Sequence, residues 1–259
     1  MFGLKNRRPT SEDAAVRAYL LKFVVVSALA LPPKDLLDAM SSTWPQSDRD
    51  GFSKDLAANR RARRDSLGRW KARLSPKEDL FSSVSPERIT PQRHADALWR
   101  LESFQTLLWA LGLVDRLPGY DAQADQDLLK TFPPSGEIGV YLKQARLRPS
   151  AEIERQRDLA ELWHWRSRTR WLIETGAPLS AASGFESYDQ IVRSIATKDA
   201  GGIGPVTDED FTAFGKAYRD LTEDQWSIVR SITMERHFAL NWLCGYAPGN
   251  QWDDTPTDT

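Results

Sequence analysis

A nearly unbroken apolar stretch near the start of the chain constrains the fold more than any other feature. Residues 20–31 read LLKFVVVSALAL, and a helix of that composition is apolar on almost every side. Such a helix belongs in the interior of a fold. It is too short to cross a bilayer, which takes about 20 apolar residues. We therefore expect a central buried helix over residues 11–31, begun by a capping box at Thr10 and Asp13 and ended by two prolines.

Cysteine content and the same apolar run indicate where the protein resides. Cys244 is the only cysteine, so the chain can form neither an internal disulfide nor a cysteine-based metal centre. The run follows basic residues, as in a secretory signal, but Glu12 and Arg17 separate the two and Lys22 interrupts the run. We therefore expect a cytoplasmic protein.

Three further stretches carry apolar residues at spacings of three and four, the pattern of one helical face. They cover residues 91–113, 149–175 and 222–244, and we expect all three to pack against the first helix. No run of alternating β-branched residues is long enough to predict a strand. The fold class that we predict is all-α.

We expect one domain, and composition divides it into segments. An N-terminal arm at residues 1–10 precedes a single helical domain at 11–259. Glycine and serine content predicts a lid or linker at 176–205, and acidic, proline-containing sequence predicts an irregular tail at 246–259. Shorter helices are expected at 33–40, 123–132, 136–145 and 185–197, and a basic helix at 52–74.

Charge is balanced over the whole chain but not locally. Lys and Arg number 35 and Asp and Glu 36, so no global field attracts nucleic acid or a membrane surface. Residues 49–73 nevertheless hold nine basic and three acidic residues, a net +6, whereas residues 208–259 hold four and ten, a net −6. A basic helix at 60–73 with Trp70 could track a phosphate backbone and stack a base. Alternatively its charges face water, or the basic and acidic regions associate.

Three charged residues fall on or beside the apolar faces of the predicted helices: Glu102, Arg166 and Arg236. A buried charge without a partner costs several kcal/mol, so we expect Glu102 to pair with Arg236 or Arg166. Such a pair either fixes how the helices pack or belongs to a ligand site. The sequence leaves both interpretations open.

A catalytic alternative rests on residues near the C-terminus. His237 and Asn241 are four apart and share a helical face. A histidine beside a carboxylate can act as a general base, which suggests a hydrolase-like enzyme using Glu235, His237, Asp253 and Asp254. Neither HExxH nor GxSxG occurs in the chain. We expect no metal and no cofactor.

Six segments of the chain together carry a family resemblance. They are WRLESFQTLLWALGL (99–113), LRPSAEI (147–153), DLAELWHW (158–165), FGKAYRDL (214–221), ERHFALNWLCGY (235–246) and WDDTPTDT (252–259). In them the chain resembles the bacterial domain-of-unknown-function family DUF4272, from about Val16 to the last residue. The resemblance implies a mostly helical bacterial protein and carries over no activity, cofactor or catalytic residue.

Polar and aromatic positions of these segments, together with Arg166, form our candidate polar cluster, structural or ligand-binding. Because the tail directly follows Gly245, it can fold back and bring its aspartates near His237 or Asn241. The candidate residues are Arg100, Glu102, Arg148, Asp158, His164, Arg166, Glu235, Arg236, His237, Asn241, Trp242, Trp252, Asp253 and Asp254.

The function that we expect is a protein-interaction module, for instance of an inhibitor or immunity type. Oppositely charged regions and ten tryptophans suit an interface, and no catalytic constellation is complete. Trp165 and Trp252 are expected to face a groove or a partner. The expected partner is another protein. Nucleic acid is a less favoured partner, and no membrane is expected.

Overall fold

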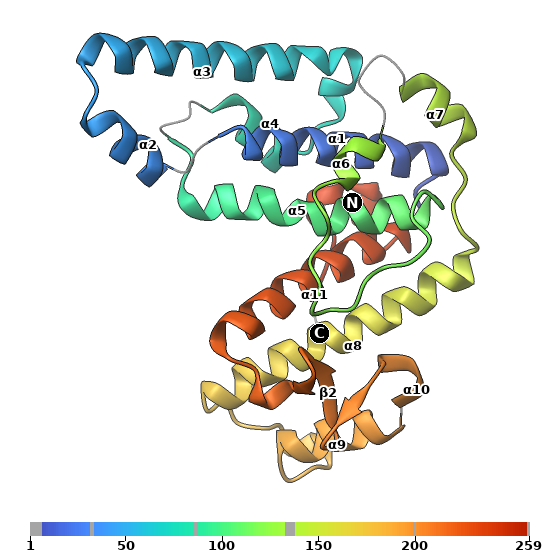
Figure 1. Cartoon of the computed structure of the whole chain (residues 1–259). Helices are drawn as coiled ribbons and strands as arrows, with labels where there is room; N and C mark the ends of the chain where they lie inside the picture. The colour runs from blue at the N-terminus through green and yellow to red at the C-terminus, as the bar shows by residue number, and fades with distance from the viewer. Residues whose placement is uncertain (1–6, 32–33, 85–87, 133–137, 199, 258–259) are drawn as a thin grey trace, which may run out of the picture.

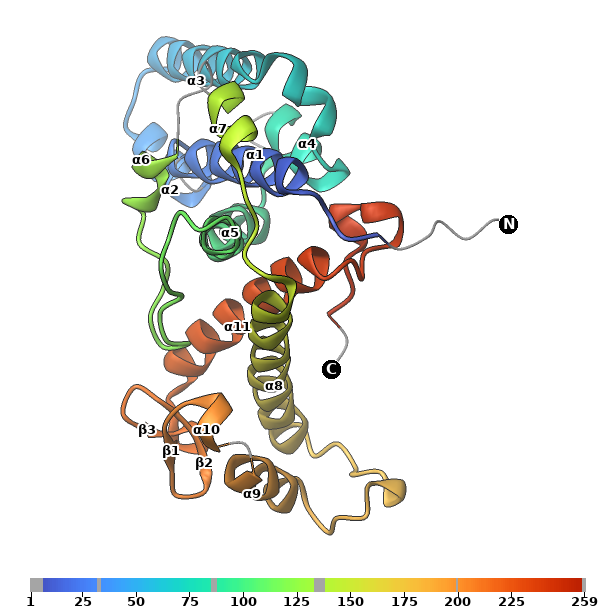
Figure 2. The same cartoon turned by 90° about the vertical axis from the view of Figure 1, so that its right-hand side faces the viewer.

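The computed structural model describes residues 7–31, 34–84, 88–132, 138–198 and 200–257. The chain is predominantly helical, which confirms the all-α prediction, with one small sheet (Figure 1). Residues 11–144 form one lobe and residues 150–217 the other, and the C-terminal helix runs between them (Figures 1 and 2).

The first helix, α1 (Ser11–Leu29), lies where the apolar run predicts it. Thr10 Oγ1 accepts a hydrogen bond from Asp13 N at 3.1 Å, and Asp13 Oδ2 accepts one from Thr10 N at 3.0 Å, so the capping box is confirmed. Its buried residues lie on every side of the helix, and Leu20 and Leu21 have no exposed surface. The two prolines predicted to end it lie outside the described residues.

Helix α5 (Pro91–Ala110), rather than α1, lies in the middle of the long helices. It packs against α1 on one side and against α11 (Glu223–Leu243) on the other, and α8 (Ser150–Glu174) packs against α11 (Figure 2). Every residue from 101 to 110 is buried, because this half of α5 has helices on both sides. Of the three helices predicted to pack against α1, α5 makes the extensive contact, because it lies between α1 and α11.

Two outer helices form a hairpin along the far side of α1. They are α2 (Lys34–Ser42) and α3 (Gln46–Ser66), followed by the 3-10 turn η1 (Gly68–Arg73) and by α4 (Pro76–Ser83). The basic helix predicted at 52–74 thus begins six residues earlier and ends at Ser66. It ends there because Gly68 adopts a φ of 52°, a left-handed conformation that interrupts an α-helix.

The structure contains a small three-stranded antiparallel sheet that the sequence analysis did not predict. Its strands are β1 (Val206–Thr207), β2 (Asp210–Ala213) and β3 (Lys216–Ala217), each too short to show alternation in the sequence. Both connections are two-residue turns with positive φ at each position, 208–209 and 214–215, the geometry that suits tight hairpins.

The remaining segments cover the ends of the long helices. Helix α9 (Tyr188–Lys198), within the stretch predicted as a lid or linker, packs against α8 and β2. The tail folds into the 3-10 turns η5 (Pro248–Asn250) and η6 (Trp252–Asp254). Three short helices, α6 (Leu128–Thr131), α7 (Ile138–Gln144) and α10 (Ala200–Ile203), and the 3-10 turns η3 (Ala181–Ser183) and η4 (Tyr218–Asp220) complete the described part of the chain. In the described part of the chain, no helix is long and apolar enough to span a membrane.

Candidate functional site

The predicted pairing of Glu102 with Arg236 is present between α5 and α11. Glu102 Oε2 lies 3.0 Å from Arg236 Nη2 and 3.1 Å from its Nε, and both side chains are at most 2% exposed. Arg236 also donates to the carbonyl oxygens of Pro118, Gly119 and Ala122, and Glu102 Oε1 accepts from the following loop at Ala124 N. The pair therefore fixes the loop after α5 against both helices.

Arg166 does not reach Glu102, and that alternative pairing is wrong. Its guanidinium instead binds both carboxylate oxygens of Asp210 at 2.7 Å, from α8 to β2. Asp210 also accepts from the backbone N–H groups of Phe211 and Arg219. The sequence analysis missed Asp210, because it lies on a strand of four residues that leaves no periodic signal in the sequence.

Arg100 and Glu235 form a third pair, 3.1 Å apart, between α5 and α11. Ser103 Oγ donates to the same carboxylate at 2.6 Å. Burial alone would lower the pKa of Arg100, but the carboxylates of Glu235, Glu78 and Asp253 raise it above its ordinary value. Arg100 therefore keeps its positive charge where α5 meets α11.

His164 and His237 meet between α8 and α11, with their Nδ1 atoms 3.0 Å apart. Arg157 can only donate, so Asn241 turns its Oδ1 to Arg157 and donates from Nδ2 to His237 Nε2 at 2.9 Å. From this network we assign the proton of His237 to Nδ1, where it is donated to His164. Asp158 lies outside the pair, bound to Arg157 at 3.0 Å.

Both histidines are held neutral. Burial, with Arg168 and Arg230 nearby, lowers the pKa of His164 to about 4. Burial, with His164 and Arg157 nearby, lowers the pKa of His237 to about 3. Neither ring takes up a proton near neutral pH, and neither has a carboxylate as its hydrogen-bond partner within the described residues.

The tail folds back, as predicted, but with different contacts. Trp252 is buried against Phe238 and Trp242, with ring centroids 4.8 and 5.3 Å apart, so the prediction that it faces a groove is wrong. Asn241 Nδ2 donates to Pro256 O at 2.8 Å. Asp253, however, accepts from Lys77 N on α4, and Asp254 is exposed. The tail positions 258–259 lie outside the described residues.

Arg148 closes the C-terminal end of α5. It donates to the carbonyl oxygens of Trp109, Val114 and Asp115 at 2.7 to 3.1 Å and pairs with Glu152 at 2.9 Å. These contacts satisfy carbonyl groups that a helix end otherwise leaves without partners. Arg148 thus has a structural role.

Much of the basic segment is neutralised within the fold. Arg64 pairs with Asp79, Lys71 with Asp65 and Arg73 with Asp13. The Arg69 guanidinium lies over the Trp70 ring, 4.4 Å from its centroid, and a base would have to stack on this same ring. The geometry therefore gives little support to a phosphate-binding helix at 60–73.

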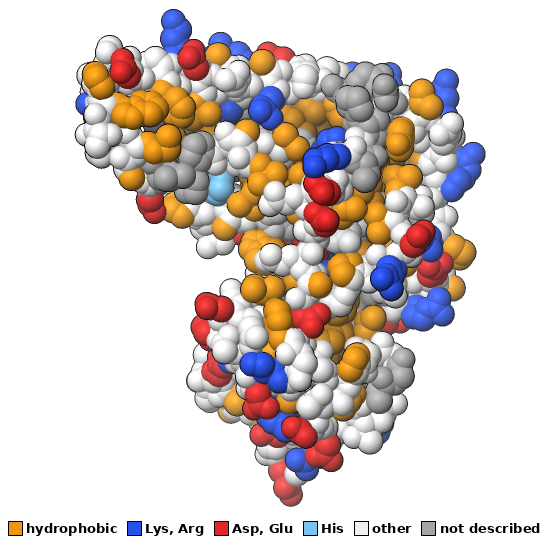
Figure 3. Space-filling view, viewed as in Figure 1, with side chains coloured by type: hydrophobic (Ala, Val, Ile, Leu, Met, Phe, Trp, Pro, Cys, Tyr) orange, Lys and Arg blue, Asp and Glu red, His pale blue; other side chains and the backbone are white. Residues whose placement is uncertain are grey.

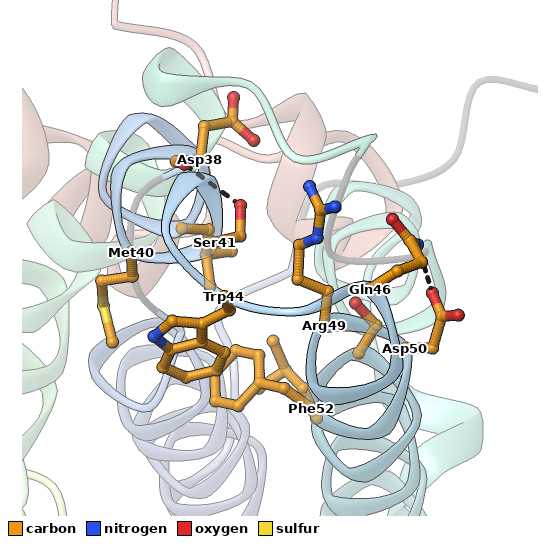
Figure 4. A pocket seen from close by; sticks show the side chains of 11 residues that line it. Asp38, Met40, Ser41, Trp44, Gln46, Arg49, Asp50 and Phe52 are labelled. Atoms are coloured by element: carbon orange, nitrogen blue, oxygen red, sulfur yellow. Dashed lines mark hydrogen bonds between the residues drawn. The ribbon is translucent and has the colours of Figure 1, made fainter.

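An exposed pocket between α2 and α3, which the sequence analysis did not predict, has a volume of about 240 Å³ (Figure 4). Trp44 at the corner of the hairpin packs edge-on against Phe52, with ring centroids 5.5 Å apart. Met40 at its edge is 39% exposed. Arg49 also lines it, and its Nε has no hydrogen-bond partner in the described part of the chain. Figure 3 shows hydrophobic side chains gathered on the surface over this hairpin.

Residues 6–180, more than half of the chain, match the model of the family "Domain of unknown function (DUF4272)". The chain belongs to the DUF4272 family. The matched region is shorter than the resemblance predicted. It does not include the segments at 214–221, 235–246 and 252–259, which lie beyond residue 180. No curated protein and no solved structure matches the chain.

The geometry of this DUF4272 chain separates the residues of the catalytic alternative. Glu235 is bound to Arg100 and Ser103, His237 to His164 and Asn241, and Asp253 to the α4 backbone. No group of three or more His, Cys, Asp or Glu side chains is placed to hold a metal among the described residues. Burial raises the pKa of the Cys244 thiol to about 11, which makes it a poor nucleophile.

Proposed function

We propose that this DUF4272 protein is a protein-interaction module that binds a partner protein through the pocket between α2 and α3. The observation that carries the proposal is that this exposed pocket combines an aromatic pair, Trp44 and Phe52, with Arg49, which forms no ion pair with a described residue. The ion pairs of the predicted cluster, in contrast, hold the fold together.

The apolar part of the pocket suits a side chain of another protein. Tryptophan, phenylalanine and methionine are enriched in protein interfaces, and the pocket presents Trp44, Phe52 and Met40 side by side (Figure 4). Its volume of about 240 Å³ is below the range of about 300–1,000 Å³ for pockets that take a drug-sized ligand. One large apolar side chain is therefore the occupant that fits.

The charges along α3 favour an acidic partner segment. Arg49 lines the pocket and forms no ion pair with a described residue, so its guanidinium group is a cation that an incoming carboxylate would pair with. Arg63 lies eleven residues after Phe52, three helical turns along the same face, and is exposed. A partner segment could place an apolar side chain in the pocket at Phe52 and a carboxylate about 16 Å away at Arg63.

We place this interaction in the cytoplasm of a bacterium, in line with the single cysteine and the family resemblance. An inhibitor or immunity protein is the form of interaction module that we favour, since such proteins act by covering a surface of their partner.

The test is site-specific crosslinking in the source organism. A photoreactive benzoylphenylalanine at Ser53, which is exposed and lines the pocket, should yield one defined protein adduct. The substitution Met40→Asp should abolish that adduct, because it puts a charge at the edge of the apolar pocket. The matched control is Leu113→Asp, at a residue of similar exposure (45%) that does not line the pocket, and it should leave the adduct intact.

Two results would contradict the proposal. One is an adduct that survives Met40→Asp, because binding would then not use the pocket. The other is the absence of any adduct from Ser53 while the protein is present and folded. With the partner purified, Met40→Asp should weaken the Kd by about tenfold or more, the loss typical of an interface anchor.

A further inference from the structure

A second pocket, separate from the proposed interface, lies between α4, α5 and the C-terminal tail, with a volume of about 320 Å³. One part of its wall is apolar and the other is charged. Three cationic and three anionic side chains line it, so the wall as a whole carries no net charge. The residues are Val24, Leu80, Phe81 and Ala97 on the apolar side and Lys77, Glu78, Arg93, Asp96, Arg100 and Asp253 on the charged side.

Two carboxylates of this wall each have an oxygen without a donor. Glu78 is 4% exposed, and its Oε2 accepts from Arg17 Nη1 at 2.6 Å and from Ser75 N at 2.8 Å. Its Oε1 has no hydrogen-bond partner in the described part of the chain, and neither has Asp253 Oδ1. Both oxygens lie beneath the pocket surface with almost no accessible area, so the two carboxylates give this part of the wall a negative potential, which favours a ligand with a cationic group.

Arg100 supplies the opposite chemistry in the same pocket. Its Nη1 binds Glu235, whereas its Nε and Nη2 make no hydrogen bond to any described residue. A guanidinium edge with two such nitrogens is suited to bind a carboxylate through parallel hydrogen bonds. The pocket thus offers a ligand hydrogen-bond donors on one side and a negative potential on the other, beside an apolar wall.

We propose that this pocket binds a free α-amino acid with an apolar side chain. Its ammonium group would lie against the negatively charged wall at Glu78 and Asp253, its carboxylate would bind Arg100, and its side chain would pack against Leu80, Phe81 and Val24. A zwitterion fits because it adds no net charge to a wall that is already balanced. The volume is at the small end of the range for ligand pockets, about 300–1,000 Å³, as a single amino acid requires.

The test compares L-leucine with two analogues that each lack one charged group. Calorimetry on the full chain should show binding of L-leucine and, for 3-methylbutylamine and 4-methylpentanoic acid, affinities about tenfold or more weaker, because each leaves charged groups of the pocket without a partner. Isoleucine, valine, methionine and phenylalanine are measured in the same way, to allow for the shape of the apolar wall. Equal binding of either analogue would overturn the proposal, as would failure of all five amino acids to bind at millimolar concentration.

Two variants locate the binding. Leu80→Trp should fill the pocket and abolish binding, and because Leu80 is 44% exposed the fold should tolerate the change. Leu113→Trp, at an equally exposed residue outside the pocket, should leave the affinity unchanged. Asp253→Asn keeps an acceptor for Lys77 N but removes the charge, so it should weaken L-leucine and leave 4-methylpentanoic acid unaffected. Binding that survives Leu80→Trp would place the ligand elsewhere and refute the assignment.

Discussion

Acidification should destabilise the protein well before its carboxylates are protonated, because of the two buried histidines. In the unfolded chain each histidine has a pKa of about 6.5. In the folded protein the pKa of His164 is about 4 and that of His237 about 3. Between these values the unfolded state binds more protons than the folded state, so the free energy of unfolding falls as the pH falls below about 6.5.

The size of the effect can be worked out at pH 5. Both folded pKa values lie below this pH, so the loss is set mainly by the difference between 6.5 and 5. That difference of about 1.5 pH units corresponds to about 2 kcal/mol for a fully buried group such as His237. His164 is partly exposed, and we expect about 1–2 kcal/mol from it. Together the free energy of unfolding should drop by about 3–4 kcal/mol between pH 8 and pH 5.

Urea unfolding followed by tryptophan fluorescence, at several pH values from 8 to 5, measures this loss. The variant His237→Gln should remove about 2 kcal/mol of the pH dependence, whatever its effect on stability at pH 8, because glutamine does not titrate. The double variant with His164→Gln should be nearly independent of pH in this range. A wild-type protein that changes by less than about 1 kcal/mol, or a double variant that falls as steeply as the wild type, would refute the reasoning.

Two further predictions concern the packing of the helices. Glu102→Leu should lower the free energy of unfolding, measured with urea, by about 3–5 kcal/mol, because it leaves Arg236 buried without its anion. Adding Arg236→Met should recover part of this loss but not all of it, because three loop carbonyl groups then lack their donor. A double variant less stable than Glu102→Leu alone would argue against the pair. Gly245→Ala should lower the free energy of unfolding by about 1–2 kcal/mol, since Gly245 has a φ of 83°. A Cβ there would also lie 3.0 Å from Arg8 N, so proteolysis of the N-terminal arm should quicken, and unchanged cleavage would count against that contact.

The sequence predicts the long helices well because their signals are local. The capping residues Thr10 and Thr222 and the spacing of apolar residues place α1, α5, α8 and α11 to within a few residues. The order in which these helices pack is not a local property. Burial on all sides marks α1 as interior, but it does not reveal that α4, η1 and α7 cover its other side while α5 separates it from α11.

Among the site residues, the pairing of Glu102 with Arg236 could be predicted because both lie on apolar helical faces. Asp210 could not, because its strand has four residues and no helical period. The interface pocket was missed for a related reason. Trp44 lies at the corner between α2 and α3, and its contact with Phe52 depends on how the chain turns there, which no local spacing of residues predicts.

The buried ion pairs explain why a chain with so many arginines offers few of them to a ligand. Arg17–Glu78 joins α1 to α4, Arg236–Glu102 joins α11 to α5, and Arg166–Asp210 joins α8 to the sheet. Each pair links elements far apart in the sequence, and apolar helix faces alone would pack in several registers. Arg236, for example, is occupied by the Glu102 carboxylate and by three loop carbonyl groups. Arg49 and Arg100 each line a pocket, and binding is to be sought at these two places.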